Sequence, residues 1–193
     1  VGSEMCIRDS FPTAEERARK GGNGVYYHIS YWGRPHDYLW LGTVHPSLVY
    51  QQMSLAYERG IQKMWILNVG DIKPAEYQVE LFLDMAWNLE AVKQQGVAAH
   101  QRHFLEREFG KNRADRLQPV MQEAYRLAYI RKPEFMGNTR EEEKDPAYRI
   151  VKDLPWSEEF INERLSSYDR LSETVEKVTS RIPADRQSAV SYT

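Results

Sequence analysis

Hydrophobic and polar positions along the first half of the chain predict two strands, each followed by a helix. Residues 25–31 read VYYHISY, a run of β-branched and aromatic residues that is typical of a strand. Residues 64–69 are apolar except at Asn68, which is the pattern of a parallel strand covered on both faces. Residues 46–59 carry an apolar stripe at helical spacing, and the proline at position 74 suits the first turn of a second helix.

The second half of the chain carries helical patterns and no further strand signal. Residues 97–109 form one helical segment, and residues 113–130 form a longer one that contains a proline at position 119. A third segment, residues 158–182, has the single apolar stripe of a bundle helix. Its apolar positions recur at alternating four- and three-residue steps: Ile161, Leu165, Tyr168, Leu171, Val175, Val178 and Ile182.

Together these elements predict an α/β part followed by an all-α part. Strands joined by helices in this order are expected to pair in parallel, with right-handed crossovers. Two such units followed by long amphipathic helices predict the end of a (β/α)8 TIM-type barrel and then part of a helical bundle, although a doubly wound sheet fits the pattern nearly as well. We assign residues 11–88 to the barrel and residues 89–189 to an incomplete helical-bundle domain.

Both ends of the chain resemble translated sequencing-adaptor sequence. Residues 1–10 read VGSEMCIRDS, and residues 190–193 read VSYT, which resembles the same adaptor read from the other strand. We exclude both segments from the fold as non-native extensions and expect the remainder to be a fragment of a longer protein. The single cysteine, Cys6, lies in the excluded part and therefore says nothing about the redox compartment.

Composition and charge limit the classes of partner. The chain has 193 residues, of which 41% are hydrophobic and 28% are charged, so it can bury a core. The net charge of -2 argues against a nucleic-acid partner, and no apolar run approaches the roughly 20 residues that span a bilayer. We predict neither a nucleic-acid nor a membrane partner.

Three motifs carry a resemblance to a known enzyme family. They are GVYYHISYWGRPHDYLWL at residues 24–41, WILNVGDIKPAEYQVELFLDMAWN at residues 65–88 and RKPE at residues 131–134. Together they are similar to glycoside hydrolase family 115, the xylan α-1,2-glucuronidases. The resemblance implies a multidomain enzyme that removes glucuronic acid or 4-O-methylglucuronic acid from xylan with inversion, in a TIM barrel followed by a helical bundle.

The same resemblance implies partners and a location. The substrate is expected to be glucuronoxylan or its oligosaccharides, no cofactor is expected, and a homodimer is left open for the full-length enzyme. The full-length protein is expected to be periplasmic or secreted. The alternative function is a non-catalytic or degenerate carbohydrate-binding barrel that has lost its acid and base.

Two carboxylates after the second strand are the catalytic candidates. An inverting glycosidase needs a general acid and a general base roughly 6.5 to 9.5 Å apart, and Asp71 and Glu76 are available in this loop. Each has a structural alternative: Asp71 as a helix N-cap, and Glu76 as a partner of the helix dipole. The acid and base can also lie on strands outside this chain.

Seven side chains near the ends of the two strands are predicted to bind the substrate. The uronate carboxylate calls for the planar fork of Arg34 or the point charge of Lys73. The histidines suit sugar hydroxyls, the aromatic residues suit an apolar sugar face, and the amide of Asn68 within an apolar run must find a partner. The seven are His28, Tyr31, Trp32, Arg34, His36, Asn68 and Lys73.

A histidine pair in the second half raises the question of a metal site. His100 and His103 lie three residues apart, with Glu106 and Glu108 nearby. No HExxH pattern supports metal binding there, and we interpret the group as a solvated helix face. We predict no metal.

Overall fold

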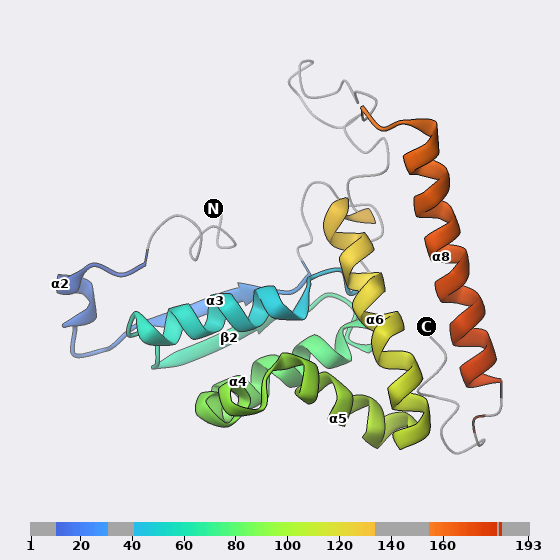
Figure 1. The fold of residues 1–193 in the computed structure, drawn as a ribbon. Helices are drawn as coiled ribbons and strands as arrows, with labels where there is room; N and C mark the ends of the chain where they lie inside the picture. The colour runs from blue at the N-terminus through green and yellow to red at the C-terminus, as the bar shows by residue number, and fades with distance from the viewer. Residues whose placement is uncertain (1–10, 31–40, 134–154, 181, 183–193) are drawn as a thin grey trace. The chain divides into compact units, whose positions relative to one another are not determined.

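The computed structural model describes residues 11–30, 41–133, 155–180 and 182. The described residues divide into two compact units, one up to residue 101 and the other from residue 102 onward. The described elements, in chain order, are α2 (Ala14–Arg17), β1 (Gly24–His28), α3 (Pro46–Glu58), β2 (Met64–Asn68), the 3-10 helix η1 (Lys73–Ala75), α4 (Glu76–Gln95), α5 (Val97–Phe109), α6 (Lys111–Ile130) and α8 (Glu158–Thr179) (Figure 1).

The first unit is built on a parallel pair of strands. β1 and β2 are hydrogen-bonded neighbours, with a register that runs from Gly24 opposite Met64 to His28 opposite Asn68. The chain passes from one strand to the other through α3, which confirms the predicted order and the parallel pairing. The described part of the chain is otherwise helical, as expected for its second half.

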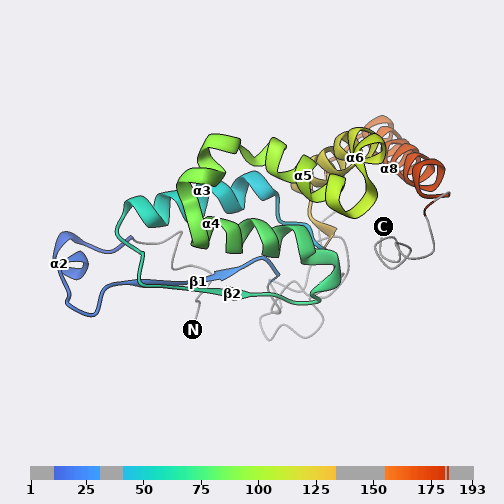
Figure 2. The same cartoon turned by 90° about the horizontal axis from the view of Figure 1, so that it is seen from below.

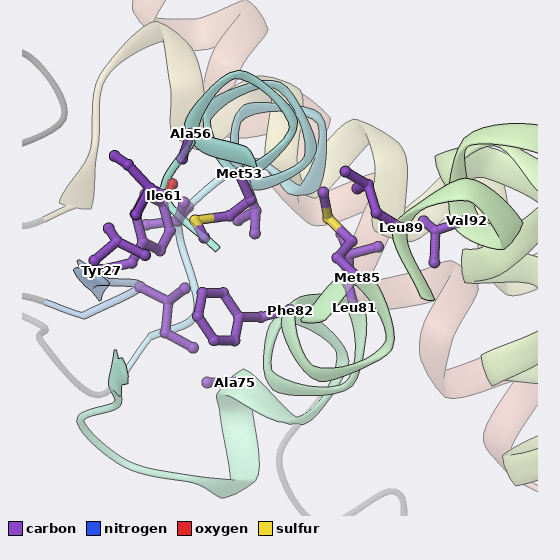
Figure 3. Packing of buried hydrophobic residues seen from close by; sticks show 14 residues of the cluster. Tyr27, Met53, Ala56, Ile61, Ala75, Leu81, Phe82, Met85, Leu89 and Val92 are labelled. Atoms are coloured by element: carbon purple, nitrogen blue, oxygen red, sulfur yellow. The ribbon is translucent and has the colours of Figure 1, made fainter. Parts of the chain in front are cut away.

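The core of this unit lies between one face of the sheet and two helices. Figure 2 shows α3 and α4 on the same side of the two strands. Side chains at alternating positions of β1 point into this layer, where they pack on the apolar stripes of both helices (Figure 3). The cluster includes Val25 and Tyr27 of β1 and the following Ile29, Val49, Met53 and Ala56 of α3, and Leu81, Phe82 and Met85 of α4.

The other face of the sheet is exposed. Met64 is 60% exposed, Ile66 43% and Tyr26 39%. The prediction that the second strand is covered on both faces is therefore wrong for the described residues. The apolar run of β2 correctly indicates a strand, but only one of its faces meets the helices that this chain provides.

The caps of α3 explain its limits. His45 is the N-cap: Pro46 occupies the first helical turn, and the Nδ1 atom of His45 accepts a hydrogen bond from the backbone N–H of Ser47 at 3.1 Å. At the other end, Gly60 has a φ of 83°, and the Ile61 N–H donates to the Ala56 carbonyl at 3.0 Å. This left-handed C-terminal motif ends the helix.

α4 bends where the barrel part was expected to end. Asn88 has non-helical backbone angles, and its Oδ1 atom accepts a hydrogen bond from the Ala91 N–H at 3.1 Å, so it caps the second segment of the helix. The compact units, however, divide later, between Gln101 and Arg102. The domain boundary between residues 88 and 89 stays a prediction.

In the second unit, α6 packs on α8, and the buried side of α8 follows the predicted apolar stripe only in part. On α8, Arg164 and Ser167 are buried, whereas Ile161 and Leu165 are 42% and 57% exposed. Arg164 is held because its guanidinium donates to the Arg131 carbonyl at 2.9 Å. The expectation of one buried stripe holds only toward the C-terminal end of α8, where Val178 is buried.

None of the described helices has the length and apolarity to cross a bilayer.

Candidate functional site

The carboxyl ends of β1 and β2 bring together a cluster on the exposed face of the sheet. The register sets His28 opposite Asn68, and side-chain alternation puts both on the face of Tyr26. The Asn68 amide Nδ2 donates to the Tyr26 hydroxyl at 2.7 Å, and the rings of Tyr26 and His28 meet edge-on with centroids 4.9 Å apart. We call Tyr26, His28 and Asn68 the sheet-face cluster.

Two predicted binding residues thus lie side by side, although forty residues separate them in sequence. The partner required by the Asn68 amide is the Tyr26 hydroxyl. Tyr26 itself was not among the predicted residues. Alternation along β1 puts Tyr26 on the same face as His28, and this signal is present in the sequence. The contact of Tyr26 with Asn68 also depends on the register between the two strands, which the sequence of neither strand shows by itself.

Asp71 lies in the exposed loop after β2. It caps neither of the helices that follow, because η1 has Ile72 and α4 has Ala75 at the N-cap, both without a side-chain cap. The interpretation of Asp71 as an N-cap is therefore wrong. Among the described residues, the Asp71 carboxylate forms no hydrogen bond or ion pair and remains open to solvent or a ligand.

Lys73 and Glu76 are paired with each other. The Nζ atom of Lys73 lies 2.8 Å from Oε1 of Glu76, and their side chains are 35% and 43% exposed. Glu76 is the first residue of α4, where the dipole favours a negative charge. A ligand carboxylate at Lys73 would have to compete with this ion pair, and the catalytic role of Glu76 stays a prediction.

Four of the predicted binding residues fall outside the described part of the chain. They are Tyr31, Trp32, Arg34 and His36. Their role in substrate binding therefore stays a prediction.

One of the two histidines of α5, His100, is buried, contrary to expectation. His100 is 5% exposed, its ring lies 5.8 Å from the ring of Tyr77, and its Nε2 atom lies 3.0 Å from Oδ2 of Asp84. The interpretation as a solvated helix face is wrong for His100 and holds for the exposed His103. The reason is that α5 packs the His100 side of its surface against α4, a contact that helical spacing alone does not predict.

Comparisons with known proteins agree with the motifs. A family model described as glycosyl hydrolase family 115 matches residues 3–135. A solved structure of a family GH115 4-O-methyl-alpha-glucuronidase with specificity for decorated arabinogalactans is 74% identical, with a TM-score of 0.86 over 93% of this chain. This chain spans 24% of the length of that protein's chain. No curated protein matches. Since the family model covers more than half of its residues, the chain belongs to glycosyl hydrolase family 115.

Proposed function

We propose that this chain is part of an inverting α-1,2-glucuronidase that releases glucuronic acid or 4-O-methylglucuronic acid from a plant polysaccharide. Family membership and the 74% identical glucuronidase support the reaction class. The observation that carries the proposal is the sheet-face cluster. Its phenol, imidazole and amide groups offer hydrogen bonds and an aromatic edge at the carboxyl ends of parallel strands, where α/β enzymes bind their substrates.

We further propose that β1 and β2 are strands of a TIM-type barrel. In such a barrel the helices cover the outer face of the sheet, and side chains of the inner face fill the interior. α3 and α4 cover one face of this sheet, and the opposite face carries Met64 and Ile66 together with the sheet-face cluster. That cluster would then lie inside the barrel, near its carboxyl end.

The roles of the remaining candidates follow from their contacts. Asp71 is the stronger candidate for acid or base, because its carboxylate is exposed and unpaired among the described residues, whereas Glu76 is paired with Lys73. The same ion pair makes Arg34 the better candidate for the uronate carboxylate, which suits a bidentate guanidinium. The acid and base can still lie on other strands of the full-length enzyme.

The polysaccharide backbone is the open part of the proposal. The motifs indicate xylan, whereas the 74% identical relative is described as specific for decorated arabinogalactans, which makes arabinogalactan a second candidate. Both would present the same glucuronate group to the sheet-face cluster. A periplasmic or secreted location and a homodimer stay predictions for the full-length protein.

The test uses the complete protein that contains this chain. It is incubated with glucuronoxylan and with glucuronate-decorated arabinogalactan, and the released sugar is followed by proton NMR from the first minutes. We expect free glucuronate or its 4-O-methyl ether, appearing first as the β-anomer because inversion of an α-linkage gives the β-product. Matched polymers with carboxyl-reduced glucuronate serve as the control.

Three outcomes decide between the alternatives. Release of the α-anomer first would contradict inversion. Release from only one polymer identifies the backbone. Binding to either polymer without release of uronate would favour the degenerate carbohydrate-binding barrel over the enzyme.

A further inference from the structure

A mixed cluster of two carboxylates and a buried imidazole lies between α4 and α5, within the first unit. Glu80 and Asp84 are four residues apart on α4 and therefore share one side of this helix. Gly96, with a φ of 79°, ends α4 and lets the chain turn back into α5, which carries His100. One ligand atom from each of the three side chains lies within 4.8 Å of the others.

The imidazole of His100 is directed into this cluster. Its side chain is 6% exposed, and its only side-chain hydrogen bond among the described residues is the contact of Nε2 with Asp84 at 3.0 Å. Its Nδ1 atom has no hydrogen-bond partner in the same part of the chain. The ring offers its Nε2 atom to Asp84, and a carboxylate oxygen of Glu80 lies within 4.8 Å of the same group of ligand atoms.

The charges at the cluster favour a cation. The carboxylates of Glu80 and Asp84 lie one helical turn apart, and a cation between them would be attracted to both. Asp84 has a side chain that is 54% exposed, so the cluster is open to solvent and to ions on that side. The ring of Tyr77 also contacts the imidazole, with the two centroids 5.8 Å apart.

We propose that Glu80, Asp84 and His100 form a zinc site that links α4 to α5. One imidazole nitrogen and two carboxylate oxygens suit zinc, whereas calcium and magnesium prefer oxygen ligands alone. Tetrahedral zinc with bonds of about 2.0 to 2.2 Å holds its ligand atoms about 3.3 to 3.6 Å apart. The contact of 3.0 Å between His100 and Asp84 must open slightly, and the Glu80 carboxylate must approach by rotation of a flexible side chain.

The hydrogen bond between His100 and Asp84 represents the metal-free form of this site. In that form Nε2 carries the proton and donates to the carboxylate. Zinc would bind the lone pair of Nε2 in the other neutral tautomer, so the imidazole proton would move to Nδ1 when the metal binds. A water molecule would complete the coordination on the exposed side of Asp84. Since the ligands come from two consecutive helices, zinc would stabilise the α4–α5 hairpin.

The test measures zinc binding by the complete protein after chelator treatment and dialysis. Isothermal titration and thermal unfolding with zinc chloride are compared for the wild type, Glu80→Gln, Asp84→Asn and the control His103→Gln. The control removes an exposed histidine of the same helix, one turn from His100. We expect the wild type and the control to bind the same number of zinc ions, with a melting temperature raised by several degrees.

Loss of a cluster ligand should weaken this site at least tenfold and remove the corresponding rise in melting temperature. Magnesium and calcium at the same concentration should have no such effect. Equal zinc stoichiometry and affinity in all four proteins would overturn the proposal, as would a response to calcium equal to that to zinc. Because Asp84 is half exposed, its variant is expected to fold, and zinc affinity is measured independently of glucuronidase activity.

Discussion

At the scale of single residues, Asp71 is the candidate for which a catalytic role and a purely structural role predict the most different experimental results. Its carboxylate lies in the exposed loop after β2, caps no helix and has no partner among the described residues. In the full-length enzyme, Asp71→Asn keeps the size of the side chain and removes its charge. If Asp71 is the general acid or base, turnover should fall at least ~100-fold, while the melting temperature stays unchanged because no cap is lost. Near-normal turnover would reduce Asp71 to a loop residue.

Tyr26 supports a second residue-scale prediction. Tyr26→Phe keeps the ring that meets His28 and removes the hydroxyl that accepts from Asn68. Losing one such hydrogen bond costs about 1 kcal/mol, so kcat/KM of the full-length enzyme should fall about fivefold, because Asn68 is no longer held in place. Tyr57→Phe is the matched control, since Tyr57 is also 39% exposed but lies on α3. Equal effects of the two substitutions on activity would argue against a role for the sheet-face cluster.

At the scale of secondary-structure elements, the sequence predicts which segments are strands and helices better than it predicts what they face. The runs that became β1 and β2 are recognisable because β-branched and aromatic residues cluster in them. β2 was predicted to be covered on both faces, but in the described residues helices pack on only one. An apolar run shows that side chains favour burial, but it does not show which face of the strand a helix packs against. On α8, Arg164 is buried whereas its neighbour Leu165 is exposed. The Arg164 guanidinium can be buried because it donates a hydrogen bond to a backbone carbonyl, and the spacing of apolar residues does not predict this.

The candidate site illustrates the same limit. His28 and Asn68 could be predicted as site residues from their places in the two runs, but the contact between Asn68 and Tyr26 depends on register. Likewise, His100 meets Asp84 only because α5 folds back on α4. In both places the sequence alone did not predict the contacts between side chains of different elements.

The N-cap of α3 gives an element-scale prediction about pH. Burial lowers the pKa of His45 from its usual value of 6.5, and its neutral Nδ1 atom accepts from the Ser47 N–H. A pKa that is lower in the folded state means that this stabilisation is complete above pH 6.5 and is lost as the pH falls through the folded-state pKa. His45→Asn retains a side-chain acceptor that does not titrate.

The measurement is the change in melting temperature between pH 7.5 and pH 5.0 for the wild type and for His45→Asn. We expect the wild type to lose more stability on acidification, by the value of one cap, about 0.5 to 1 kcal/mol. An identical pH dependence of the two proteins would show that the His45 cap does not titrate in this range.

At the scale of the whole molecule, the described chain has apolar surface that its own elements do not cover. A two-stranded sheet is marginal by itself, and the face opposite α3 and α4 exposes Met64 and Ile66. β1 and β2 pair only with each other among the described residues, so each also has an unpaired edge. Such surfaces and edges favour association between chains.

We therefore expect the isolated 193-residue chain to release no glucuronate and to self-associate. Sedimentation at increasing concentration should detect oligomers, and a dye that reports exposed apolar surface should bind strongly. Ile66→Thr should reduce association, because it removes apolar surface from the open sheet face while keeping a β-branched side chain in the strand. Ile161→Thr on α8 is the matched control, since Ile161 is 42% exposed and Ile66 is 43% exposed. If both substitutions reduced association equally, general apolar exposure and not the open sheet face would drive association. If the isolated chain were a monomer with glucuronidase activity, the prediction would be wrong, because the sheet would need no further strands.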